Sequence, residues 1–228
     1  MNYIETFVFF KDKLLKGAYE TLFMVFVSVF IGIALAIPIA IYIYETRHSD
    51  KKYLKVINSI IGAIVNTIRS IPFLIFIVVV MPVSFFIIGT SFGMYASIVP
   101  LSIIAFALST KFIEQSLLTI KPSLTQTAFI MGANKFQTYR HFYWVEIRPH
   151  LILGLTTMII SVVSYSSVMG TIAGGGLGDL AIRYGYQEYH PKLMIIVLIL
   201  MFIIVQIIQQ TGNILAKYYD KQKKRGIQ

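Results

Sequence analysis

Arg69 is the first residue in this chain whose type and position suggest chemistry. It separates two uncharged stretches, Val56 to Ile68 and Ser70 to Thr110. A charge inside so apolar a region is costly unless it faces protein or water, and such residues often have functional roles. The guanidinium either binds a solute carboxylate beside a polar path, or anchors the chain on backbone carbonyls freed by Pro72. The sequence leaves both interpretations open.

A glycine-rich stretch and a hydroxyl-rich stretch are the next candidates. Gly174 to Gly178 is not followed by the lysine and hydroxyl residue of a phosphate-binding loop. Glycine permits close backbone approach, so the stretch predicts either a tightly packed gate or ordinary helix packing. Ser166 and Met169 lie in a segment whose hydroxyls line a path or bond their own helix. The candidate pathway or gate residues are Arg69, Ser166, Met169, Gly174, Gly175 and Gly176.

Other kinds of reactive site are not expected. The sequence contains no cysteine, which excludes thiol catalysis and disulfides. The four histidines are scattered without the spacing of metal ligands, so no metal site is predicted. No Walker motif is present, so this chain is not expected to hydrolyse ATP and is interpreted as a non-enzyme.

The composition indicates an all-α integral membrane protein. Of the 228 residues 57% are hydrophobic and 13% charged, about half the charge of ordinary soluble domains. The uncharged segments are too long for barrel strands and long enough for membrane-spanning helices. We therefore expect one transmembrane domain, 1–228, with a cytoplasmic region at about 118–149. The five expected crossings are about 18–44, 56–82, 95–117, 151–172 and 193–216.

The lysines and arginines predict the orientation of the chain. Fourteen of them lie in the 45–55 loop, the 111–149 segment and the tail, while five lie on the opposite side. Cytoplasmic loops carry the excess of these residues, so we expect the N-terminus outside and the C-terminus in the cytoplasm. The basic residues flank the spans and form no compact basic face, so nucleic-acid binding is not expected.

The 118–149 region is far longer than an ordinary connection between helices, which indicates function. Ser123 with Gln126 resembles a helix-capping box, Gly132 is suited to a left-handed helix end, and Asn134 with Gln137 predicts a second helix start. Pro149 predicts a break before the fourth span. Apolar residues recur at helical spacing at Phe136, Tyr139, Tyr143 and Ile147. This face either docks into a partner's groove or lies on lipid.

Several motifs together resemble a known family. Gln126-Thr127-Ala128 followed by Gly132 and Ala133 is similar to the cytoplasmic coupling motif of ABC-importer permeases. The chain more specifically resembles methionine-uptake permeases over about 18–212. The segments that carry this likeness are Arg69-Ser70-Ile71-Pro72-Phe73, Val83 to Gly93, Ile98-Val99-Pro100-Leu101, Met131-Gly132-Ala133, Gly174 to Gly178 and Tyr184-Gly185-Tyr186.

The resemblance implies a set of partners. It implies a homodimer, two cytoplasmic ATP-binding subunits that hold ATP and Mg²⁺, and an extracytoplasmic substrate-binding protein, in a bacterial plasma membrane. The residues implied to contact the ATPase are Gln126, Ala128, Gly132, Ala133 and Phe136. Gln126 stands where the family usually has glutamate, which removes a charge-assisted contact. Val145 stands where the family usually has proline.

Alternative functions stay open from sequence. A permease of the same type for another amino acid or an osmolyte fits the same motifs. An ATP-independent secondary transporter is disfavoured because the five expected spans show no internal repeat. A membrane-embedded enzyme is disfavoured because we expect neither intramembrane carboxylates nor paired histidines.

Overall fold

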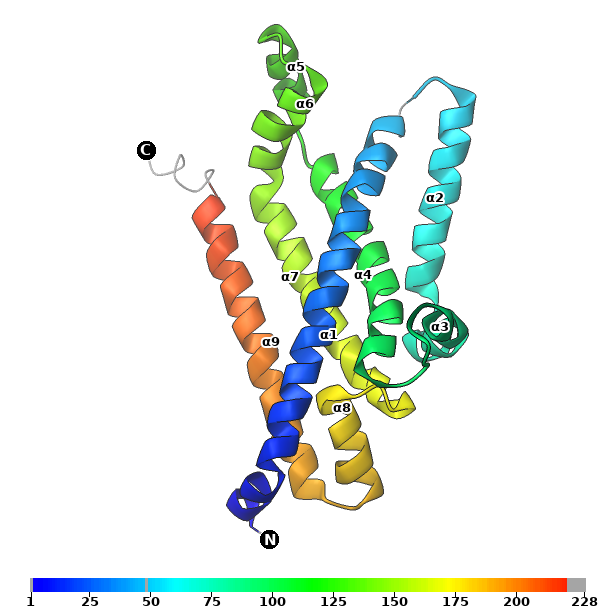
Figure 1. The fold of residues 1–228 in the computed structure, drawn as a ribbon. Coiled ribbons are helices and arrows are strands. Elements are labelled where there is room, and N and C mark those ends of the chain that lie inside the picture. The colour runs from blue at the N-terminus through cyan, green and yellow to red at the C-terminus, as the bar shows by residue number, and fades with distance from the viewer. Residues whose placement is uncertain (1, 48, 221–228) are drawn as a thin grey trace.

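The computed structural model describes residues 2–47 and 49–220, and the regular secondary structure of this part of the chain is all helical (Figure 1). The expected basic tail residues Lys221, Lys223, Lys224 and Arg225, and His48, lie outside it. The elements are α1 (Tyr3–Thr46), α2 (Lys52–Ser70), α3 (Phe73–Ile88), α4 (Gly93–Leu118), α5 (Pro122–Ile130), α6 (Lys135–Gln137), η1 (Thr138–Tyr143), α7 (Trp144–Val168), η2 (Met169–Ile172), α8 (Gly176–Leu180), η3 (Ala181–Gln187) and α9 (Pro191–Tyr219).

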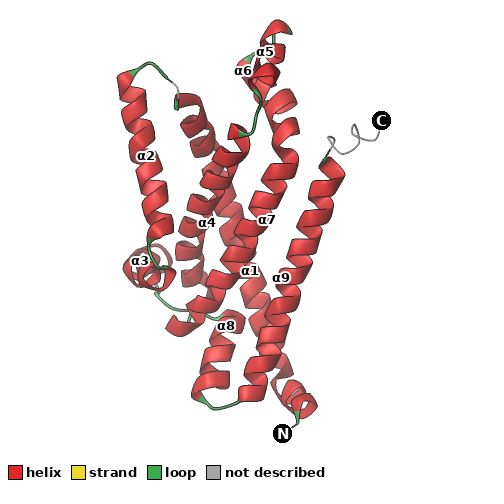
Figure 2. Cartoon of the chain, turned by 180° about the vertical axis from the view of Figure 1, so that it is seen from behind, coloured by secondary structure: helices red, strands yellow, loops and turns green. Residues whose placement is uncertain are grey.

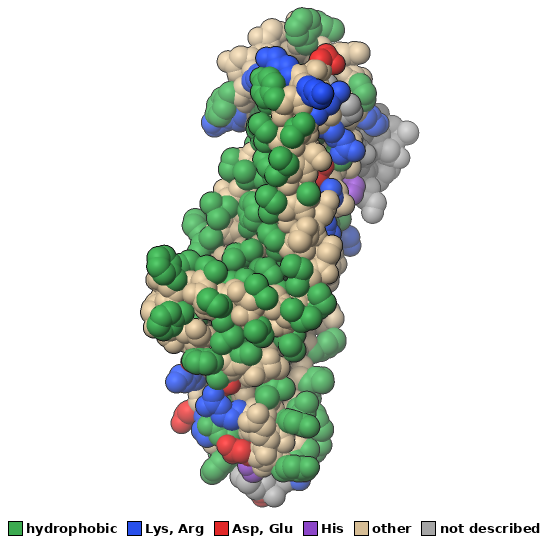
Figure 3. All heavy atoms as spheres, turned by 90° about the vertical axis from the view of Figure 1, so that its right-hand side faces the viewer, with side chains coloured by type: hydrophobic (Ala, Val, Ile, Leu, Met, Phe, Trp, Pro, Cys, Tyr) green, Lys and Arg blue, Asp and Glu red, His purple; other side chains and the backbone are tan. Residues whose placement is uncertain are grey.

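Within the described residues, four helical stretches are long and apolar enough to cross a membrane: α1, α4, the run from Lys135 to Ile172, and α9. Figure 2 shows them side by side, with α5 and α6 at one end of the molecule and α8 at the other. On the face that Figure 3 shows, hydrophobic side chains cover the middle of the molecule and charged side chains gather toward the two ends. This distribution matches a bilayer around the middle of the molecule.

The expected crossing at 56–82 is not one straight helix. It consists of α2 and α3, which meet at a bend of 113°. Proline lacks an amide hydrogen and disfavours helical geometry in the residue before it. Ile71 is accordingly extended, with φ −74° and ψ 131°. If this bent pair crosses once, the described chain has the five expected crossings.

The break expected at Pro149 is also absent. Helix α7 begins at Trp144 and continues through the proline to Val168. Membrane-spanning helices tolerate an internal proline because neighbouring groups satisfy the freed carbonyl. The start of α7 therefore forms one helix with the fourth predicted span.

Among the described helices, α1 and α4 form the most extensive contact with each other. Small residues recur every fourth position along one face of α1, at Ser28, Gly32, Ala36 and Ala40, and all are buried. A Cβ added at Gly32 would lie 2.7 Å from the Ala105 Cβ of α4. The Ser28 hydroxyl donates to the Ile98 carbonyl at 3.3 Å. Small residues at this spacing let two membrane helices approach until their backbones touch.

The apolar core is divided along the length of the molecule. Its central part contains Met24, Leu101 and Met158, contributed by α1, α4 and α7. Near the α5 end, α1 and α4 are joined by charge as well: the buried Glu114 carboxylate pairs with Lys111 at 2.9 Å and Arg47 at 3.3 Å. These contacts make α1 and α4 a single packed unit.

Candidate functional site

The tip, which we define as residues 122–137, projects beyond the packed helices at the α5 end (Figure 1). The capping box expected from Ser123 and Gln126 is wrong. Lys121 is the N-cap of α5 and makes no side-chain cap, while Pro122 occupies the first turn. Proline is suited to this position because its missing N–H would be unpaired there anyway.

The second predicted helix start is confirmed. Asn134 Oδ1 accepts from the Gln137 amide at 2.9 Å, and Gln137 Oε1 accepts from the Asn134 amide at 2.9 Å. Gly132 has a φ of +70°, the left-handed conformation predicted for the helix end. No atom would lie within 4 Å of an added Cβ there, so conformation and not space requires the glycine.

The exposed surface of the tip differs from the expected one. Ala128 is 1% exposed, whereas Gln126 and Gly132 are exposed and Ala133 is half-buried. The large exposed side chains are instead Phe129 (84%), Ile130 (82%), Met131 (69%) and Phe136 (69%). Sequence reasoning missed the first three, although three consecutive apolar residues before a helix-ending glycine were a usable signal. We call these four residues the apolar patch.

The prediction that Phe136, Tyr139, Tyr143 and Ile147 share one helical face is only partly correct. Tyr143 and Ile147 are buried against the helices, whereas Phe136 is exposed and lines a cleft together with Tyr139. The cause is η1, Thr138–Tyr143, which is a π-helix. Its wider turn shifts the register between α6 and α7, so residues spaced for one α-helical face do not share it.

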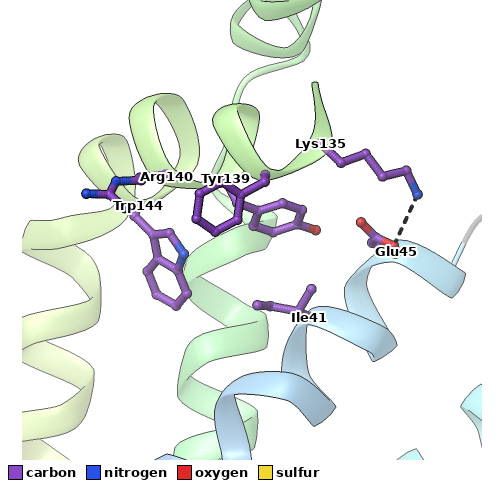
Figure 4. A pocket seen from close by; sticks show the side chains of 7 residues that line it. Ile41, Glu45, Lys135, Tyr139, Arg140 and Trp144 are labelled. Carbon is purple, nitrogen blue, oxygen red and sulfur yellow. Dashed lines mark ion pairs between the residues drawn. The ribbon is translucent and has the colours of Figure 1, made fainter. Parts of the chain in front are cut away.

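A cleft of about 510 Å³ lies between the tip and the end of α1 (Figure 4). Lys135 Nζ of α6 is 3.5 Å from Glu45 Oε2 of α1. The Tyr139 hydroxyl lies toward Glu45 in the same view.

At the opposite end, the glycine segment, residues 170–178, is packed to backbone contact. Gly174 is buried, and a Cβ there would lie 2.6 Å from Ser97 Oγ and 2.7 Å from the Met169 carbonyl. Gly178 is packed against the backbone of Ser167. The Ser97 hydroxyl, from α4, donates to the Gly174 carbonyl at 2.9 Å. The predicted close packing of this stretch is thus present.

Helix α1 also holds the glycine segment. Glu20 Oε2 accepts from the Gly176 amide at 2.8 Å, and Thr21 Oγ1 accepts from the Leu177 amide at 2.8 Å. Gly175 and Gly176 have φ values of +80° and +81°, which side-chain-bearing residues rarely adopt. These glycines place the two amides against α1.

The other pathway candidates occupy different environments. Ser166 and Met169 are buried in α7 and η2, and the Ser166 hydroxyl donates to the Val163 carbonyl at 2.7 Å. Arg69 is exposed near the end of α2, and its guanidinium has no partner among the described residues. The ring centroids of Phe73, at the start of α3, and Tyr165, in α7, lie 4.3 Å apart. The structure therefore brings the α2–α3 break beside the hydroxyl-rich part of α7, but not Arg69 into contact with Ser166.

The sequence comparisons agree with this architecture. Residues 32–222 match the family model described as the binding-protein-dependent transport system inner membrane component. The chain belongs to that family. It is 37% identical to the probable D-methionine transport system permease protein MetI of Vibrio cholerae, covering 92% of this chain and 93% of that protein. It is 36% identical to the D-methionine transport system permease protein MetI of Escherichia coli, and the match covers 69% of this chain and 72% of that protein.

Solved structures give the same assignment. One chain of the MetNI methionine ABC transporter, in an inward-facing conformation, superposes with a TM-score of 0.87 at 35% identity. The match covers 92% of this chain and 97% of that chain. A chain of an amino acid ABC transporter with histidines matches at a TM-score of 0.77 and 17% identity, which is a likeness of fold. This chain is therefore an inner-membrane permease of the ABC-importer type.

Proposed function

We propose that this chain is the permease subunit of an ATP-driven methionine importer and works as a homodimer. The carrying observation is the superposition on the MetNI transporter chain, at a TM-score of 0.87 over nearly all of that chain. The curated relatives at 36–37% identity carry D-methionine transport in their names. Likeness over the whole length at this identity supports a shared substrate class.

The ATP-binding subunit docks on the tip in this proposal. The apolar patch supports this role because four large side chains stand exposed next to a rigid turn. Such anchors fill hydrophobic grooves and supply most of the binding energy of an interface. Gln126 and Gly132 are exposed beside the patch and touch the same subunit, whereas Ala128 and Ala133 support the turn from within. The ATP and Mg²⁺ belong to that subunit, and this chain performs no covalent chemistry.

The glycine segment serves as the outer gate. With the N-terminus outside and the C-terminus cytoplasmic, the α8 end faces the extracytoplasmic binding protein. Closure of two ATPase subunits on ATP would bring the two tips together and open this end, and hydrolysis would reset it. Ligand binding drives such a cycle by favouring one of two states.

A second copy of the chain completes the pathway. Two symmetric copies enclose a path on their shared axis, which five crossings cannot surround alone. Arg69 supports this arrangement because its charge is exposed at membrane depth in one copy. It faces the water-filled path and attracts the substrate carboxylate, with the Ser166 and Met169 region of α7 behind the lining.

The test is methionine uptake by proteoliposomes that contain the chain, its ATP-binding subunit and its binding protein. Gly132→Asp and Gly132→Asn are compared, because both residues tolerate the left-handed conformation and only aspartate adds a charge beside the apolar patch. We expect the aspartate variant to lose most uptake and the asparagine variant to keep more. Wild-type hydrolysis that responds to another solute but not to methionine would reject the substrate. A chain that binds no ATPase would reject the importer.

A further inference from the structure

Helix α1 touches both functional ends of the molecule. At one end Glu45 pairs with Lys135 of the tip, and at the other Glu20 and Thr21 hold the amides of the glycine segment. Twenty-five positions separate Glu20 from Glu45, or about 37 Å along a helix. Helix α1 is assigned as one helix over this length, with Pro38 inside it. One helix therefore reaches from the ATPase side to the gate side.

Apolar packing also attaches the tip to the helices before it, since Leu124 packs against the cluster that contains Ala36 and Ala40 of α1. The covalent connections of the tip are α4 through residues 119–121 and η1 through Thr138. The Lys135–Glu45 contact is the only ion pair between the tip and a preceding helix among the described residues. It is a contact between segments 90 positions apart. The pair is therefore a polar link between the tip and α1, beside the packing of Leu124.

The opposite end of α1 is attached to the glycine segment by short hydrogen bonds. Thr21 is buried, and its hydroxyl is the acceptor for the Leu177 amide. A buried amide that loses its acceptor is unfavourable, so the glycine segment follows Thr21 when α1 moves. Ser97 of α4 holds Gly174 in the same way. Helix α4 also packs against α1 at Gly32.

We propose that α1 is the connector that carries tip movement to the glycine segment, and that the Lys135–Glu45 pair is the joint that engages it. Both residues are positioning residues that touch no substrate. This inference rests on the proposed function and adds the route between its two ends. The pair lies at the protein surface, where an ion pair adds little to stability. Its role is to make α1 follow the tip.

The test measures movement at both ends of the molecule. Because the chain has no cysteine, spin labels can be placed at Ser123→Cys in the tip and, in a separate sample, at Thr171→Cys in the glycine segment. Both sites are exposed. Distances between the two copies of each label are measured in the full complex, with cysteine-free partner subunits, before and after ATP is trapped. Wild type is expected to change both distances.

Lys135→Ala and Glu45→Gln are expected to keep the ATP-dependent change at Ser123 and lose most of that at Thr171. Methionine transported per ATP should fall about two- to fivefold, the factor expected for an exposed pair. The swapped variant Glu45→Lys with Lys135→Glu should restore both readouts. Lys55→Ala is the matched control, since it removes an exposed charge that has no ion pair among the described residues.

Three results overturn the inference: an unchanged Thr171 movement in both single variants, a Ser123 movement that is lost as well, or a swap that rescues nothing. The second result would place the pair in ATPase contact. Wild-type transport of methionine is recorded in the same vesicles. Its absence would reject the proposed function, whereas its presence with any of the three results would reject only the connector.

Discussion

Gly32→Ala tests the close packing of α1 and α4 most sharply. The added Cβ would lie 2.7 Å from the Ala105 Cβ and 2.8 Å from backbone atoms of Ala105 and Phe106. Carbon atoms at their best separation are about 3.5–4.0 Å apart. The helices must therefore separate by about 1 Å. The neighbouring backbone cannot make room as a flexible side chain could.

The separation also weakens the neighbouring hydrogen bond. The Ser28 hydroxyl is already 3.3 Å from the Ile98 carbonyl, and a further shift of about 1 Å exceeds hydrogen-bond range. Overpacking costs about 1–3 kcal/mol, and an interhelical hydrogen bond in a membrane about 0.6 kcal/mol. We expect the free energy of unfolding of the Gly32→Ala variant to fall by about 2–3 kcal/mol, which corresponds to a fall in Tm of about 5–10 °C.

The assay is thermal unfolding of the purified chain in detergent, followed by loss of the monodisperse peak. Gly62→Ala is the matched control, because it is also a helix glycine but nothing lies within 4 Å of its added Cβ. Its Tm should stay constant or rise, since alanine favours helix. Equal Tm values for wild type and Gly32→Ala would refute the packing argument. The additional change Ala105→Gly should restore only part of the loss, because the backbone contacts remain.

Three further changes have defined outcomes. Thr21→Val keeps the side-chain shape but leaves the buried Leu177 amide without its acceptor, so stability should fall by about 1–3 kcal/mol in thermal unfolding; an unchanged Tm would contradict this. Asn134→Ala removes the capping box and should cost the second helix of the tip about 1 kcal/mol, seen as faster amide exchange at residues 135–138 and nowhere else. Phe129→Ala removes a large exposed side chain and should weaken ATPase binding about fivefold or more, measured by titration of the subunit; unchanged affinity would place the docking surface elsewhere.

Local signals in the sequence predicted much of the fold. Uncharged length located the crossings, and the Asn134–Gln137 pair located a helix start, because these features depend only on neighbouring residues. Errors arose where two local signals competed. Pro122 sets the start of α5 from Lys121, which displaces the expected cap at Ser123. At Pro72 the proline bends the chain, whereas at Pro149 the helix continues.

The contacts that define the site could not be read from sequence. Glu20 and Gly176 are 156 positions apart, and Glu45 and Lys135 are 90 apart. Such pairs depend on how the helices pack, and no periodicity in the chain encodes them. Three residues of the apolar patch were missed for a different reason. Phe129, Ile130 and Met131 follow one another directly, whereas a helical face is recognised from apolar residues three or four positions apart.

The most direct test of the account measures ATP hydrolysis and methionine uptake together, in vesicles that contain the full complex. We predict that both begin when binding protein and methionine are added outside, and that both stop when ATP is withheld from the side that the ATPase occupies. Methionine accumulation that continues without ATP would contradict the account, because the chain would then act as a secondary carrier.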